Sequence, residues 1–227
     1  MTRQVIVSLV SKGRLRKESL NIFKRKKILI KSEKGERDLI GYGKYKNIPI
    51  KFLFQHAREC IDALSNNAAD IAISGKDLLL NTEIEIQKKI KIYKNLNFGY
   101  ASLKIFCDHN WIDCNSLLDV SEIATEMFKK YKEPMKCGTK YTRIVDNFFE
   151  EKNVKNVTTI VSNGATEGMI RQNASSLVAD ISSSGRTAMA NNLKEVANIM
   201  ESSAVLMVSK KSQNNKEVKK ILKLLSK

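Results

Sequence analysis

The sequence predicts an α/β fold of one or two compact domains with mostly parallel sheets. Short runs of β-branched and other apolar residues alternate with helical patterns along the chain, which is typical of strands joined by helical crossovers. Several predicted strands pass straight into a helix through glycine and small polar residues. The composition favours a real core, since 42% of the 227 residues are hydrophobic and only 10 are Gly and 2 are Pro.

The individual elements follow from apolar runs and from turn signals. Strands are expected within residues 4–10, 48–54, 68–77, 102–106, 136–141, 157–160, 176–181 and 204–208. Helical patterns are expected within 15–23, 57–64, 120–131, 142–149 and 216–225. A change of pattern at 97–100 marks the crossing into a second domain. The expected lobe I is 1–98 plus about 183–227, and the expected lobe II is 99–182.

The net charge of +16 suggests an anionic partner, but its distribution argues against nucleic acid. Lysines are scattered over the chain and are dense only at 24–27 and in the C-terminal tail. No aromatic residues are interleaved in those clusters, so a base-stacking surface is not indicated. We interpret most of the charge as a solvated basic surface.

The cysteines and the hydropathy pattern predict a cytoplasmic protein. Four cysteines show no CxxC pair and no histidine at zinc spacing, so free thiols in a reducing compartment are expected. No apolar run approaches the roughly 20 residues of a membrane span, and the N-terminus leads directly into a strand pattern rather than a signal peptide.

One strand-to-helix turn has the features of a phosphate site. The strand predicted at 157–160 is followed by small polar residues at 162–168, and Met169 begins a helical pattern. Backbone N–H groups at such a turn point toward an anion, and the helix dipole adds positive potential. Glu167 is placed to accept from a sugar hydroxyl. The segment 162–168 is not a P-loop, because no Gly-Lys-Ser/Thr follows its glycine. Taken alone, this segment is better explained as an ordinary tight turn.

Two further turns of the same kind supply possible partners for one ligand. The first strand ends at Ser11, and Lys12 and Arg14 flank Gly13 before a helical pattern begins. A second strand closes on Ser-Gly-Lys at 74–76. Ligands bind at the carboxyl ends of strands in open α/β sheets, so the three turns point to one crevice lined for an anion. Solvated charges around ordinary glycine turns remain the alternative.

Six short motifs, each weak alone, are specific when taken in their order along the chain. They are Ser11-Lys12-Gly13-Arg14-Leu15, Arg37-Asp38-Leu39, residues 67–79, Thr139-Lys140-Tyr141, Asn163-Gly164-Ala165-Thr166-Glu167 and residues 180–193. In this order they resemble, nearly end to end, the ATP phosphoribosyltransferase family, the first enzyme of histidine biosynthesis. The chain departs from the family pattern at His56, where Arg is common, and near Ser176 and at Ser183, where the family carries acids.

The resemblance implies an architecture and a reaction. The fold would be two α/β lobes like the periplasmic-binding-protein type II architecture, with the active site in the cleft between lobes. The reaction would join N1 of ATP to C1 of phosphoribosyl pyrophosphate, release pyrophosphate and use Mg²⁺. The chain resembles the short form of the family, which implies a homodimer and a regulatory subunit resembling histidyl-tRNA synthetase.

The resemblance also implies roles for individual residues. Arg14 and Arg37 would be catalytic, because guanidinium groups pair two oxygens of the departing pyrophosphate at once. The substrate-binding set would be Lys12, Asn163, Gly164, Ala165, Thr166, Glu167, Asp180, Ser184 and Gly185. No residue is assigned directly to the metal. Structural roles remain open for several of these residues: Asp180, for example, is equally explained as a turn or cap residue.

Three other functions compete with this interpretation. A non-enzymatic two-lobed module that binds small anions would share the fold, since that fold does not fix function. A basic nucleic-acid-binding protein would explain the charge and would bind with a steep salt dependence. A degenerate phosphoribosyltransferase that depends on its partner would explain the missing acids.

Overall fold

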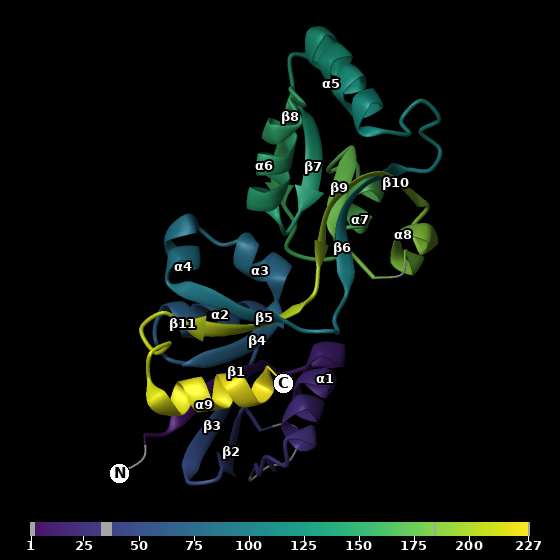
Figure 1. The fold of residues 1–227 in the computed structure, drawn as a ribbon. Helices are drawn as coiled ribbons and strands as arrows, with labels where there is room; N and C mark the ends of the chain where they lie inside the picture. Colours follow the sequence, from purple (N-terminus) through teal and green to yellow (C-terminus); the bar gives the residue numbers. More distant parts are fainter. Residues whose placement is uncertain (1–2, 33–37, 184, 227) are drawn as a thin grey trace. The chain divides into compact units, whose positions relative to one another are not determined.

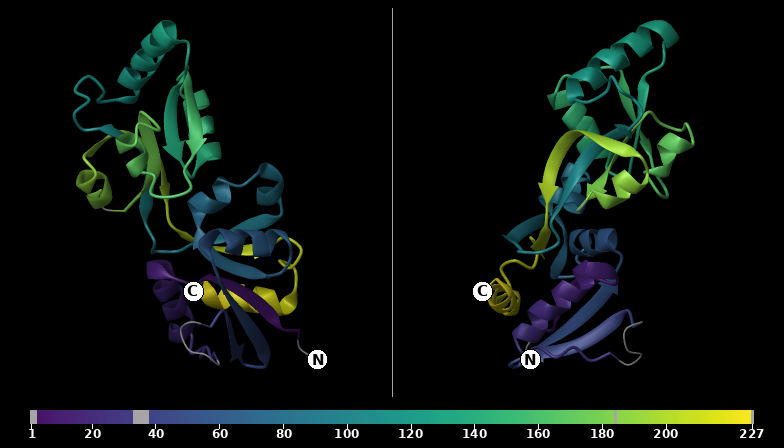
Figure 2. Two further views of the ribbon diagram at one scale, coloured as in Figure 1. Left: turned by 180° about the vertical axis from the view of Figure 1, so that it is seen from behind. Right: turned by 90° about the vertical axis from the view of Figure 1, so that its right-hand side faces the viewer.

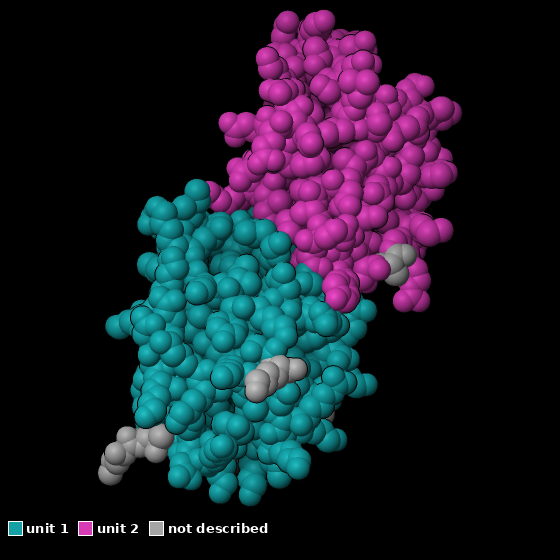
Figure 3. All heavy atoms as spheres, in the orientation of Figure 1, with its two compact units in different colours: residues 1–99, 203–227 teal, residues 100–202 magenta. Residues whose placement is uncertain are grey.

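The computed structural model describes residues 3–32, 38–183 and 185–226, and its chain divides into two compact units. Unit 1 combines residues 1–99 with 203–227, and unit 2 is the intervening stretch 100–202 (Figures 1 and 3). Each unit has its own sheet and its own buried core.

Unit 1 is built on a six-stranded sheet in the order β2-β3-β1-β4-β11-β5. Its strands are β1 (Val5–Val10), β2 (Ile40–Tyr45), β3 (Ile48–Gln55), β4 (Ile71–Gly75), β5 (Ile90–Asn95) and β11 (Ala204–Ser209). Its helices are α1 (Gly13–Arg25), α2 (Ala57–Ser65), α3 (Lys76–Leu80), α4 (Ile84–Lys88) and α9 (Lys216–Leu225).

Helices cover both faces of this sheet, which explains why its central strands are apolar throughout. In β11 every residue is buried. Leu206 faces a core that includes residues of α1 and α9, whereas Val205 and Met207 face a second core with residues of α2 and α3. Successive strand residues point to opposite faces, so a strand buried on both sides reads as a continuous apolar run. The separate layers are visible in Figure 2.

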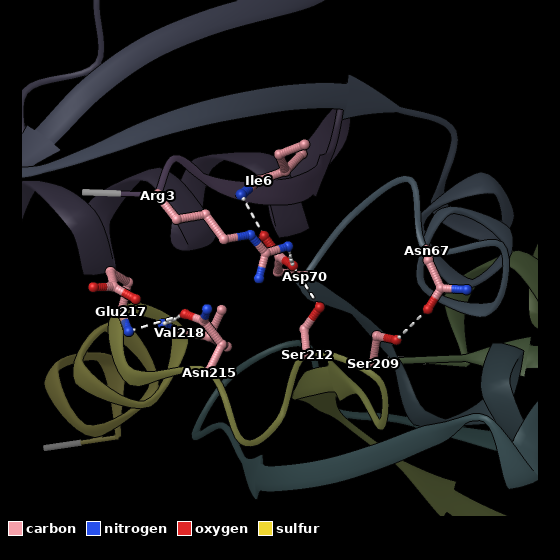
Figure 4. Close-up of polar contacts among 9 residues, drawn as sticks. All are labelled: Arg3, Ile6, Asn67, Asp70, Ser209, Ser212, Asn215, Glu217 and Val218. Atoms are coloured by element: carbon pink, nitrogen blue, oxygen red, sulfur yellow. Dashed lines mark hydrogen bonds and ion pairs between the residues drawn. The ribbon is translucent and has the colours of Figure 1, made fainter. Parts of the chain in front are cut away.

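A buried carboxylate ties the ends of unit 1 together (Figure 4). Asp70, which is 3% exposed, accepts hydrogen bonds from Arg3 Nη2 at 2.8 Å, from the Ile6 amide at 2.9 Å and from Ser212 Oγ at 2.5 Å. Arg3 precedes β1, Ile6 belongs to β1, and Ser212 follows β11. Burying a charge is costly unless its oxygens are bonded, and here three donors satisfy it.

Unit 2 is built on a five-stranded sheet in the order β10-β6-β9-β7-β8. Its strands are β6 (Ala101–Asp108), β7 (Met135–Thr139), β8 (Val157–Val161), β9 (Leu177–Ser182) and β10 (Leu193–Ser202). Its helices are α5 (Leu117–Tyr131), α6 (Thr142–Glu151), α7 (Gly168–Arg171) and α8 (Arg186–Ala190). Apolar residues of α5 and α6 belong to the main core of the unit, and residues of α7 and α8 belong to a smaller cluster with Phe106 and Val178.

The two-lobed α/β architecture predicted from the sequence is confirmed, but the sheets are mixed rather than mostly parallel. The parallel pairs are β1–β3, β1–β4, β7–β8 and β7–β9. The strands β2, β5 and β10, which the sequence analysis missed, all pair antiparallel with their neighbours. β11 also runs antiparallel to β4.

The missed strand β2 has a weak sequence signal. β2 contains Gly41 and Gly43, which typically lower strand propensity. Both are required here, because a Cβ on Gly41 would lie 2.8 Å from the Ile30 side chain and one on Gly43 would lie 2.9 Å from the Leu29 carbonyl. The glycines therefore let the segment before β2 pack closely against it.

The second boundary between the units differs from the predicted one. The expectation returned the chain to the first lobe at about residue 183, whereas the structure keeps it in unit 2 through Ser202. The reason is β10, which pairs with β6 from Leu193↔Asp108 to Ser202↔Ala101 and so belongs to the second sheet.

Candidate functional site

The loop after β8 is the first part of the candidate site. It closes through a hydrogen bond between the hydroxyl groups of Ser162 and Thr166, whose oxygens lie 3.0 Å apart, with both residues buried. Asn163, Gly164 and Ala165 lie on the exposed side of the loop, and nothing lies within 4 Å of a Cβ built on Gly164. Within the described part of the chain, the amides of these three residues donate to no protein acceptor. Consecutive amides of this kind suit an anion.

Asp180, near the end of β9, lies against this loop. Its Oδ1 accepts from the Ile181 amide at 2.7 Å, and Thr166 also hydrogen-bonds its carboxyl group. Burial raises the pKa of Asp180 above its ordinary value, and the charge of Glu167 raises it further. The Ile181 amide, Lys140 and Thr166 partly oppose that rise.

The turn after β9 is the third part of the candidate site. Gly185 has a φ of +71°, a left-handed conformation that favours glycine, and its amide donates to Ser182 Oγ at 3.0 Å. The helix α8 begins at the next residue, Arg186. Ser184, predicted to bind substrate, lies outside the described residues.

These segments line one cavity of about 350 Å³ in unit 2. Of the predicted site residues, the structure brings Ala165, Glu167, Asp180 and Gly185 to its wall. Thr166 is not among the lining residues; it is fully buried and hydrogen-bonds the carboxyl group of Asp180. The remaining lining residues are Phe106, Lys140, Val178, Ile181, Ser182, Ser183, Arg186, Thr187, Ala188 and Leu193.

Two cations of this wall, Lys140 and Arg186, were absent from the predicted site. Lys140 belongs to the Thr139-Lys140-Tyr141 motif, and Arg186 directly follows Gly185, so both had a signal in the sequence. The sequence did not reveal that β7 pairs with β9, and this pairing brings together the ends of two strands that are far apart in the chain.

The predicted residues of unit 1 are placed differently. Lys12 precedes α1 and lines a cavity of about 780 Å³ together with Arg16, Lys17 and Asp38. Arg14 is exposed and is not part of that wall. The sequence analysis missed Arg16, whose guanidinium carbon lies 5.2 Å from the centre of the Phe54 ring. Arg37 lies outside the described residues.

Comparison with known proteins identifies the family. A family model described as HisG, ATP phosphoribosyltransferase, matches residues 56–227, which is most of the chain. The chain belongs to the ATP phosphoribosyltransferase family. It is therefore a transferase of the phosphoribosyltransferase type, assigned to the first step of histidine biosynthesis.

Curated relatives match almost the whole chain. An ATP phosphoribosyltransferase of Afipia carboxidovorans is 28% identical over 99% of this chain and 70% of its own length. One from Rhodopseudomonas palustris is 30% identical over 92% of this chain and 65% of its length. One from Chelativorans sp. is 28% identical over 97% of this chain and 96% of its length. The chain thus spans about two thirds of some relatives and nearly all of others.

Solved structures share the fold. The ATP phosphoribosyl transferase (HisG:HisZ) complex from Thermotoga maritima contains a similar chain, with a TM-score of 0.75, 18% identity, and coverage of 98% of this chain and 96% of that one. The arginine-bound form of truncated ArgBP from the same organism is similar with a TM-score of 0.54 at 12% identity, covering 98% of this chain and 94% of that one. The fold is thus shared with solute-binding proteins, and the family match favours the transferase over a binding module.

None of the helices among the described residues combines the length and apolar character that a membrane crossing requires.

Proposed function

We propose that this chain joins N1 of ATP to C1 of phosphoribosyl pyrophosphate with release of pyrophosphate, and that the cavity of unit 2 binds the phosphoribosyl group. The observation that carries the assignment of the cavity is the convergence of separate segments on it. The loop at 162–167 supplies Glu167 and the Ala165 backbone, the turn after β9 supplies Asp180 and Arg186, and Lys140 adds a second cation directly after β7.

The amides and cations account for the 5′-phosphate. The N–H groups of Asn163, Gly164 and Ala165 donate to no protein acceptor among the described residues, and Ala165 lines the cavity together with the cations Lys140 and Arg186. Backbone amides and a guanidinium together suit a phosphate, because both direct N–H groups at its oxygens. Ser184 and Gly185 complete the substrate-binding set in this proposal.

The two carboxylates account for the ribose. Glu167 and Asp180 line the cavity, and an ionised carboxylate is acceptor-only, so each fits a donating hydroxyl of the sugar. The positive charge that develops at C1 when the C1–O bond breaks is also stabilised by nearby negative charge.

In unit 1, we propose that Lys12, Arg14 and Arg37 bind phosphate oxygens of the substrates. Arg16 and Lys17 join Lys12 around the 780 Å³ cavity, and Arg16 is held against Phe54. Arginine forks pair two oxygens at once, whereas lysine acts as a point charge. The adenine nitrogen is a weak nucleophile, so the rate depends on positioning and on stabilising the leaving pyrophosphate. No general base is needed at N1, because N1 carries no proton.

The described residues would hold Mg²⁺ only together with the phosphates of a substrate, which is how this ion is usually bound. No three His, Cys, Asp or Glu side chains converge in the described residues. Glu167 and Asp180, however, offer two carboxylates on the wall of the unit 2 cavity, and Mg²⁺ is commonly bound by one or two carboxylates plus substrate phosphates. When bound, the ion neutralises charge on the departing pyrophosphate.

We further propose that the chain works in the cytoplasm, as a homodimer, with a regulatory subunit that resembles histidyl-tRNA synthetase. The support is the similarity to the transferase chain of the Thermotoga maritima HisG:HisZ complex. Size-exclusion chromatography of the chain alone and with such a subunit tests this assembly.

The test of the activity follows phosphoribosyl-ATP by its near-ultraviolet absorbance, with ATP, phosphoribosyl pyrophosphate, Mg²⁺ and pyrophosphatase present. We expect turnover, and a loss of kcat in Arg14→Ala beside a wild-type control. Arg16→Ala is the matched variant that separates the role of Arg14 from that of its neighbour in α1. Absence of turnover even with the regulatory subunit, while a substrate binds, would indicate a degenerate relative. Absence of binding of either substrate would refute the proposal.

A further inference from the structure

Two of the four cysteines lie against each other in unit 2, away from the residues assigned above. Cys107 is near the end of β6 and Cys114 lies in the connection to α5, and both are 0% exposed. Cys107 Sγ donates to the carbonyl oxygens of Cys114 at 3.4 Å and of Asp108 at 3.5 Å, and the side chains of the two cysteines are close enough to shift each other's pKa. The other two cysteines, Cys60 and Cys137, are buried without a thiol neighbour.

We propose that Cys107 and Cys114 are an oxidation site, at which exchange with a small organic disulfide such as glutathione disulfide forms a reversible intramolecular disulfide. A disulfide needs two cysteines whose side chains reach each other. The 3.4 Å contact of Cys107 Sγ with the Cys114 carbonyl brings the two buried cysteines together, and a change of side-chain rotamer then brings the sulfurs to bonding distance.

The groups around Cys114 indicate that its sulfur is the one that attacks first. The interaction with the Cys107 side chain lowers the pKa of the Cys114 thiol, and the Lys194 ammonium lowers it further. Burial and the charge of Asp119 act in the opposite direction. Lys194 is held at this place, since its Nζ donates to Asn115 Oδ1 at 2.8 Å. The thiolate is the nucleophile in disulfide exchange, so Cys114 attacks first.

The pKa of Cys107 is raised, which makes it the second sulfur to react. The hydrogen bond to Cys114 raises this pKa most, burial and the charges of Cys114 and Asp108 add to the rise, and Lys194 opposes it. Once Cys114 is a mixed disulfide, its negative charge is gone and the hydrogen bond that held the Cys107 proton is weakened. Cys107 can then lose that proton.

The exchange balances in two steps. The Cys114 thiolate attacks one sulfur of the organic disulfide, forms a mixed disulfide and expels one thiolate, which takes up a proton. Cys107 then gives up its proton and attacks the Cys114 sulfur, so that the internal S–S bond forms and the second thiol leaves. The two cysteines are oxidised by two electrons and the organic disulfide is reduced to two thiols.

A thin segment covers the pair, so a local opening is enough for the reagent to enter. Asp113 and Asn115, on either side of Cys114, are exposed, and Ile112 is 80% exposed. Segments with few buried contacts open at low free-energy cost. The resulting crosslink closes a short loop, which restricts the unfolded chain and raises the midpoint of thermal unfolding.

The decisive experiment uses the wild-type chain, so it does not depend on a variant that folds poorly. The native protein is incubated with glutathione disulfide, and its free thiols are counted by alkylation and mass spectrometry. We expect a loss of two of the four thiols, with a mass change equal to two hydrogen atoms. A protease that cuts before aspartate separates the two cysteines at Asp108 and Asp113, and the resulting peptides remain joined only if the disulfide is present.

Variants then test the order of the steps. In Cys107→Ser the mixed disulfide should persist as a glutathionyl adduct on Cys114, in Cys114→Ser no adduct should form, and Lys194→Gln should slow the reaction. Cys60→Ala is the control and should leave the loss of two thiols unchanged. Retention of all four thiols in the native protein would overturn the proposal. Loss at Cys60 or Cys137, or a permanent glutathione adduct in the wild type, would overturn it as well.

Discussion

The tripeptide Ala-Asp-Ile occurs once in each unit, and its aspartate serves a different purpose in each. Asp70 in unit 1 accepts from Arg3, Ile6 and Ser212, and it is almost fully buried. Asp180 in unit 2 accepts from the adjacent amide of Ile181 and from Thr166, and it faces a cavity. A carboxylate whose oxygens are fully bonded stabilises the fold, whereas one that retains acceptor capacity toward a cavity is available for a ligand.

The largest expected effect is on folding, from Asp70→Asn. The amide offers a single acceptor oxygen, so either the Ile6 amide or the Arg3 and Ser212 donors lose their acceptor. We expect the free energy of unfolding to fall by about 3 kcal/mol, as measured by denaturant titration. Below its unfolding temperature the variant should keep its KM for phosphoribosyl pyrophosphate, and a selective loss of substrate binding would place Asp70 in the site instead.

The next effect is on activity, from Asp180→Asn. Removing a charged acceptor from the ribose should lower kcat/KM by about 10–100-fold, in the assay of phosphoribosyl-ATP formation.

The stability of Asp180→Asn should change in the opposite direction to its activity. Because the folded-state pKa of Asp180 is raised, its ionised form costs stability at any pH above its ordinary value of 3.8. At neutral pH the variant should therefore be as stable as the wild type or slightly more stable, and this gain should disappear as the pH falls below that ordinary value. A less stable variant at neutral pH would mean that Asp180 is a structural residue like Asp70.

The smallest effect is expected from Arg3→Gln, which removes the ion pair of Asp70 but leaves its two other donors. The side chain of Arg3 is 50% exposed, so solvent screens the pair. We expect the free energy of unfolding to fall by about 0.5–1 kcal/mol in low salt, and by less in high salt. A cost as large as that of Asp70→Asn would assign most of the stabilisation to the ion pair.

The comparison also shows what the sequence could predict and what it could not. The loop around Thr166 and the acid Asp180 were predicted, because a local strand-to-helix pattern and short motifs mark them. The opposite roles of Asp70 and Asp180 were not, since the donors of Asp70 lie between 64 and 142 residues away in the chain. Only the folded sheet brings them together.

The same limit explains the errors in the fold. β10 reads as a polar segment, and its place in the second sheet depends on its pairing with β6 across a long stretch of chain. Lys140 and Arg186 were missed for a similar reason, because their convergence on one cavity depends on the order of strands in that sheet. Local patterns predict the elements, and pairings between distant segments decide the site.

The most direct measurement is the calorimetric binding of phosphoribosyl pyrophosphate with Mg²⁺ to the wild type, Asp180→Asn and Asp70→Asn, below the unfolding temperature of each. We predict that Asp180→Asn binds at least tenfold more weakly, while Asp70→Asn binds like the wild type. Wild-type affinity should also fall as the pH is lowered through the raised pKa of Asp180. The part of the pH dependence that comes from Asp180 should be missing in Asp180→Asn. Equal binding by the wild type and Asp180→Asn would contradict a phosphoribosyl site in unit 2.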